Sequence, residues 1–101
     1  MVFEHPLPSA YSSSRFAEHM ASIRGVHCLM AGCSLDETIL ATVIDGFHRG
    51  DRFCVVSNAV TSVQSVAGDA GVHRASMMRV IGKFAGVEQS SDLIEAIAAS
   101  A

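Results

Sequence analysis

The sequence predicts an α/β fold, with a Rossmann-like parallel sheet that helices cover on both faces. Two observations support this prediction. Short apolar runs alternate along the chain with longer segments of helical periodicity, and the short runs are apolar throughout rather than at every second residue. Continuous apolar strands are typical of parallel sheets buried on both sides. With 101 residues, the chain is expected to form one domain, residues 1–101, around a modest core.

The first quarter of the chain predicts an irregular segment, a helix and a strand. Residues 2–10 contain two prolines, which exclude a regular helix there. A helix follows, which Ser13 or Ser14 can cap and which Gly25 suits as a stop. The apolar run at residues 26–32 is short and bounded by glycines, so we expect a buried strand.

The stretch "AGCSLDETIL" opens the longest predicted helix. Ser34 and Glu37 have the S-x-x-E spacing of a capping box, which places the helix start near Leu35. Apolar residues continue at helical spacing until Gly50. The remaining predicted elements are a buried strand at 52–58, a loop or short helical turn at 59–71, a helix at 73–84, a short strand at 85–89 and a capped helix at 90–100.

Composition limits the partners of this chain. Half of its residues are hydrophobic and only 17% are charged, against about 25% in typical globular chains. We therefore expect apolar surface that meets another chain, in a homo-oligomer or a larger assembly. The net charge of −3 and the lack of a basic run argue against nucleic acid. No apolar run approaches the ~20 residues of a membrane span, and no signal-peptide pattern is present, so a cytoplasmic location is expected.

The three cysteines, Cys28, Cys33 and Cys54, are odd in number, and two of them lie inside apolar runs. This pattern favours buried reduced thiols over a disulfide framework. His27 and Cys28 have no second pair at zinc-site spacing, so neither a metal nor a cofactor is expected.

The helix start at 33–38 is the main candidate site, because ligands of open α/β sheets bind at the carboxyl ends of strands. Free backbone N–H groups and the helix dipole would favour an anion there, although a plain capped connection explains the same residues. Cys33 is either a thiol activated by the helix N-terminus or a small residue filling a turn. His5, beside Glu4, is either a general base or an ordinary loop residue.

Three stretches, taken in order, resemble the isochorismatase-like, or cysteine hydrolase, superfamily over nearly the whole chain. They are "VFEHPLPSAYSSSRFAEHM", "VHCLMAGCSLDETILATVIDGFHRGDRFCVVSNAVTS" and "HRASMMRVIGKFAGVEQSSDLIEAI". The resemblance implies hydrolysis of amide, carbamoyl or related bonds in small molecules by an Asp–Lys–Cys triad.

At the positions of the family's catalytic residues, this chain carries other residue types. The resemblance places Thr38 at the nucleophile position and His5 at the Lys position, and the triad Asp would lie upstream of this chain. Thr38 is a poor nucleophile without an adjacent base. Gly32, Ser34 and Tyr11 are the candidate binding residues.

The resemblance also implies an incomplete sheet and a non-proline cis peptide at Cys33–Ser34. In the strand order 3-2-1-4-5-6, this chain holds the equivalents of strands 3 to 6. An unpaired central edge is costly, so either another chain completes the sheet or the N-terminal segment repacks. The chain is then a hydrolase unit completed by an N-terminal half, a catalytically inactive binding or assembly module, or a fragment of a longer enzyme.

Overall fold

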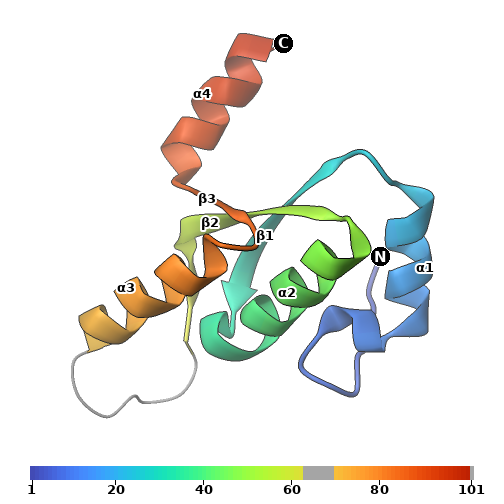
Figure 1. Ribbon diagram of the computed structural model, residues 1–101. Coiled ribbons are helices and arrows are strands. Elements are labelled where there is room, and N and C mark those ends of the chain that lie inside the picture. Colours follow the sequence, from blue (N-terminus) through green and yellow to red (C-terminus); the bar gives the residue numbers. More distant parts are fainter. Residues whose placement is uncertain (63–69, 101) are drawn as a thin grey trace.

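The computed structural model describes residues 1–62 and 70–100, which form α-helices and β-strands in alternation (Figure 1). The elements are a 3-10 turn Ala10–Ser12, α1 Ser14–Ser22, β1 His27–Cys33, a π-helical segment Leu35–Ile39, α2 Leu40–Arg49, β2 Arg52–Thr61, α3 Ala70–Ile81, β3 Gly86–Glu88 and α4 Ser90–Ser100.

The described strands form one parallel sheet in the order β1-β2-β3. Met30 of β1 pairs with Val55 of β2, whereas Gly32 pairs with Val60, so β2 contains an irregular stretch between these two pairs. Each pair of neighbouring strands is joined through a helix, as parallel pairing requires. The α/β prediction with a parallel sheet is confirmed.

Helices α1, α2 and α3 all pack on the same face of the sheet. Cys28 and Met30 of β1 lie opposite Phe53 and Val55 of β2, so these four side chains share one face. Both hydrophobic clusters of the core include residues of this face, one with α2 and α3 and the other with α1. The connections from β1 to β2 and from β2 to β3 run in the same direction across the sheet. Because such connections are right-handed, their helices α2 and α3 lie on the same face.

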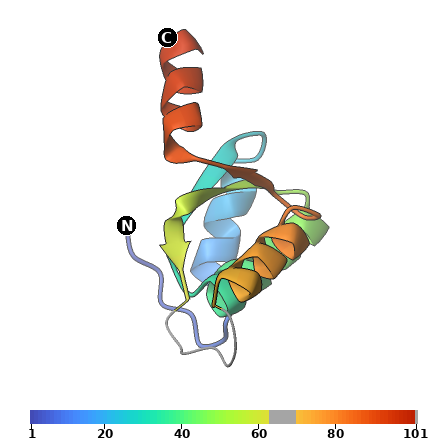
Figure 2. The ribbon, with the colours of Figure 1, turned by 90° about the vertical axis from the view of Figure 1, so that its left-hand side faces the viewer.

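The second face of the sheet is exposed along β1, whereas Cys54 and Val56 of the central strand are buried there. Leu29, Cys54 and Gly86 lie at one register across the three strands on this face, and the Leu29 side chain is 53% exposed. Helix α4 leaves this region and projects away from the rest of the molecule (Figures 1 and 2). Of the cover on both faces that the sequence predicts, the described chain has helices α1, α2 and α3 packed on the first face.

The N-terminal segment is irregular, as predicted, and residues 1–6 pair with no described strand. Phe3 instead packs edge-on against Phe16 and at a tilt against His19 of α1, with ring centroids 5.5 and 5.7 Å apart. The resemblance implies four strands, and the segment equivalent to the first of them packs on α1 instead of pairing in the described sheet.

The helix boundaries follow local chemistry. The Ser13 side chain accepts a hydrogen bond from the Phe16 amide and caps α1. Gly50 ends α2 in the left-handed region, with φ of 83°, where a Cβ would be strained. Helix α3 begins at Ala70, three residues before the predicted start, and β2 continues to Thr61. Much of the predicted loop at 59–71 lies outside the described residues.

Of the helices that the structure describes, none has the length and apolar character needed to cross a membrane.

Candidate functional site

The candidate site is the bend where β1 leaves the sheet. Gly32 has a φ of 105°, a conformation that side chains rarely adopt, and the Cys33–Ser34 peptide bond is cis, as the resemblance implies. The π-helical segment starts directly after this bend. Its residues Leu35 and Ile39 are 1% and 2% exposed and fix it against the core, while Thr38 between them is half-buried.

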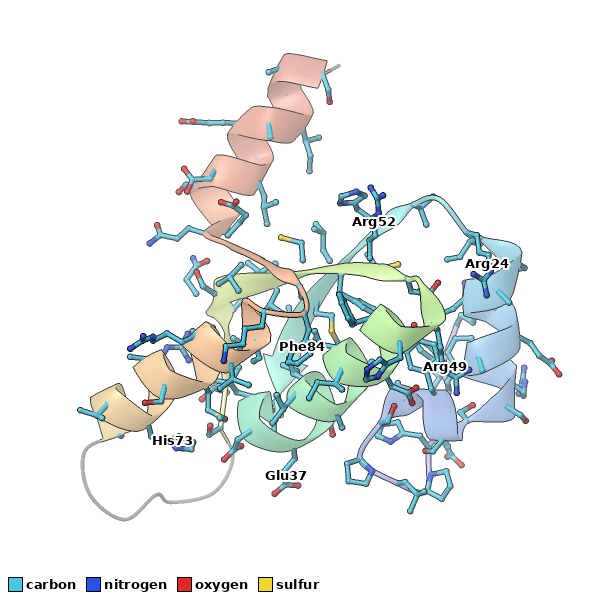
Figure 3. The ribbon with its side chains drawn as sticks, in the orientation of Figure 1. Arg24, Glu37, Arg49, Arg52, His73 and Phe84 are labelled. Atoms are coloured by element: carbon cyan, nitrogen blue, oxygen red, sulfur yellow. The ribbon has the colours of Figure 1, made fainter. Side chains whose placement is uncertain are left out.

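The capping box predicted from Ser34 and Glu37 does not form. The Ser34 side chain makes no cap hydrogen bond, and its hydroxyl donates to Asp36 Oδ1 at 2.8 Å. The Ser34 carbonyl accepts from the amides of Glu37 and Ile39, at 3.3 and 3.0 Å. The first π-helical hydrogen bond therefore uses the backbone carbonyl of Ser34, and the Ser34 hydroxyl is available to bond Asp36. Glu37 is exposed and points away from the body (Figure 3).

Asp36 joins this bend to α3. Its Oδ2 lies 3.2 Å from His73 Nε2, and both side chains are about a quarter exposed (25% and 26%). The hydrogen bond from Ser34 holds the pKa of Asp36 below its usual value, and His73 adds to this effect. Asp36 and Glu37 also place two carboxylates in the first helical turn. This acidic turn complements the helix dipole itself and disfavours the anionic ligand that the sequence suggests.

The structure places Tyr11 away from this bend. Its side chain is 5% exposed, and its hydroxyl donates to Asp51 Oδ2 at 2.5 Å. Asp51 precedes β2 and so lies at the opposite end of the sheet from Cys33, while the Arg49 guanidinium lies 4.5 Å from the centre of the Tyr11 ring. Burial and the hydrogen bond to Asp51 raise the pKa of Tyr11. Tyr11 thus fastens the N-terminal segment to the end of α2.

His5 is exposed, and its Nδ1 lies 2.6 Å from the carbonyl oxygen of Leu7. Within the described residues, no hydrogen bond links His5 to Thr38, and the Thr38 hydroxyl has no side-chain or backbone partner. A hydroxyl must lose its proton to attack a carbonyl. The described chain therefore brings no base to the position where the resemblance puts the nucleophile.

The three cysteines are free, and the prediction that all are buried is wrong for Cys33, which is exposed at the bend. Cys54 is buried and Cys28 is half-buried, and in both cases burial raises the pKa of the thiol. Among the described residues, no three His, Cys, Asp or Glu side chains are grouped to hold a metal ion.

Sequence reasoning missed the Ser34–Asp36–His73 chain of hydrogen bonds. His73 and Asp36 are 37 residues apart, and neither sits in a recognisable motif. The one local signal for this chain of hydrogen bonds is Asp36, two positions after Ser34. The capping-box spacing instead pairs Ser34 with Glu37.

No family model matches this sequence, and no curated protein matches it either. Solved structures do match. One is a protein assigned as an isochorismatase from Burkholderia xenovorans, with a TM-score of 0.83 and 20% identity, covering 96% of this chain and 49% of that one. This chain has the isochorismatase-like fold.

Two further structures agree. An isochorismatase-like hydrolase from Alkaliphilus metalliredigens matches with a TM-score of 0.72 and 11% identity, over 93% of this chain and 48% of that one. The nicotinamidase of Bacillus subtilis matches with a TM-score of 0.65 and 20% identity, over 82% of this chain and 44% of that one. The chain thus spans about half the length of these three structures.

Proposed function

We propose that this chain is half of an isochorismatase-like hydrolase unit, which cleaves an amide or carbamoyl C–N bond of a small molecule once a second polypeptide completes the sheet. The observation that carries the proposal is the bend after β1. Near the end of the edge strand β1 stands Gly32 with a positive φ, and the helix that follows carries the half-buried Thr38 beside the open edge of the sheet.

The open edge of β1 is where the completing strand would pair. A groove of about 450 Å³ runs beside this edge, between the N-terminal segment, α1 and β1, and Phe3, Phe16 and Leu29 are among its mostly apolar lining residues. Strand β1 carries no Lys, Glu, Asp or Pro, the residues that commonly protect an edge strand from pairing. A second polypeptide that paired here would bring its own side chains to the bend and to Thr38.

The test is co-expression of this chain with a second polypeptide. The second polypeptide corresponds to the part of the Burkholderia xenovorans protein that this chain does not match. Ammonia release from nicotinamide and from simple carbamoyl compounds is measured for the chain alone and for the co-purified pair. We expect no turnover by the chain alone and turnover by the pair. Turnover by the chain alone would show that no completing polypeptide is needed.

Two substitutions locate the nucleophile in the active pair. Thr38→Ala should abolish turnover, because it removes the hydroxyl at the nucleophile position, and Cys33→Ala should leave it in place. The opposite result would move the nucleophile to Cys33, at the bend itself. Both residues lie outside the buried core, so neither change should alter the unfolding transition.

The second candidate function is a catalytically inactive binding or assembly module. Its support is that Thr38 has no hydrogen-bonded base in the described chain and that the nearby carboxylate and imidazole, Asp36 and His73, are bonded to each other. A pair that assembles stably but hydrolyses none of these compounds would favour this function over the first.

A further inference from the structure

We draw no further inference here: the strongest candidate, the exposed apolar side of helix α4 that carries Ile94 and Ile97, supports none, because nothing in the structure shows what covers it.

Discussion

Gly46 of α2 packs closely against Phe53 of β2. A Cβ added there would lie 2.4 Å from Phe53 Cε2 and 3.1 Å from the Tyr11 hydroxyl. Gly46→Ala should therefore lower the free energy of unfolding by about 1–3 kcal/mol, the usual range for an overpacked core, as measured by urea denaturation. Gly86→Ala is the control, because its Cβ would meet Cys54 Sγ at an ordinary 3.5 Å. Equal stability of the two variants would contradict this close packing.

Asp36 makes stability depend on pH through the hydrogen bond from Ser34, with His73 as a further contributor. Its pKa is lower in the folded chain than in the unfolded chain. The stabilisation is therefore complete above the unfolded value, about 3.9, and is lost as the pH falls through the folded pKa. Ser34→Ala should raise the pKa of Asp36 in a carboxyl NMR titration and reduce the loss of stability between neutral and acidic pH. Ser91→Ala, on exposed α4, should do neither.

At the scale of elements, two hydrogen bonds between Asn58 and Ser90 connect the start of α4 to β2. Asn58→Ala removes both hydrogen bonds to Ser90, one of which satisfies an amide of the first helical turn. We expect a loss of about 0.5–2 kcal/mol of local helix stability, as for the loss of an N-cap. Hydrogen–deuterium exchange should show faster exchange in α4 and unchanged exchange in α2. Protection of α4 that is equal in the variant and the parent would show that other contacts hold it.

The irregular stretch of β2 is stabilised from α3. Arg74 donates through Nη1 to the Val60 carbonyl at 2.8 Å and through Nη2 to the Ser57 carbonyl. These carbonyls lie where the regular ladder with β1 is interrupted. Arg74→Met should leave both without this donor and cost about 1–3 kcal/mol of stability by thermal or urea unfolding. Arg79→Met, on the exposed side of the same helix, should have little effect.

For the whole molecule, the open edge of β1 should be detectable in the isolated chain. The central strand β2 is paired on both sides, whereas β1 is paired on one. Hydrogen–deuterium exchange should therefore be slow along Phe53–Val56 and fast at the β1 amides that face away from β2. Addition of a completing polypeptide should slow those β1 amides. Slow exchange along all of β1 in the chain alone would mean that its edge is already paired.

The local elements of this chain could be predicted because their signals are local. Ser13 caps α1 through a neighbouring amide, Gly50 ends α2 in a conformation suited to glycine, and the apolar runs became strands. The capping box at Ser34 and Glu37 does not form, because a spacing pattern does not show whether the Ser34 hydroxyl will accept from the Glu37 amide or, as it does, donate to the nearby Asp36 carboxylate.

The sequence by itself determined the order of helices and strands, the parallel sheet and the similarity to a half-length isochorismatase-like fold, since periodicity, caps and motif order are encoded between near neighbours. Only the tertiary structure decided that Tyr11 is buried against Asp51, that Asp36 meets His73, and that α1, α2 and α3 share one face. These features depend on contacts between residues tens of positions apart. The exposure of Leu29 on β1 and of Ile94 and Ile97 on α4 likewise depends on how the elements are arranged in space, which no local pattern shows.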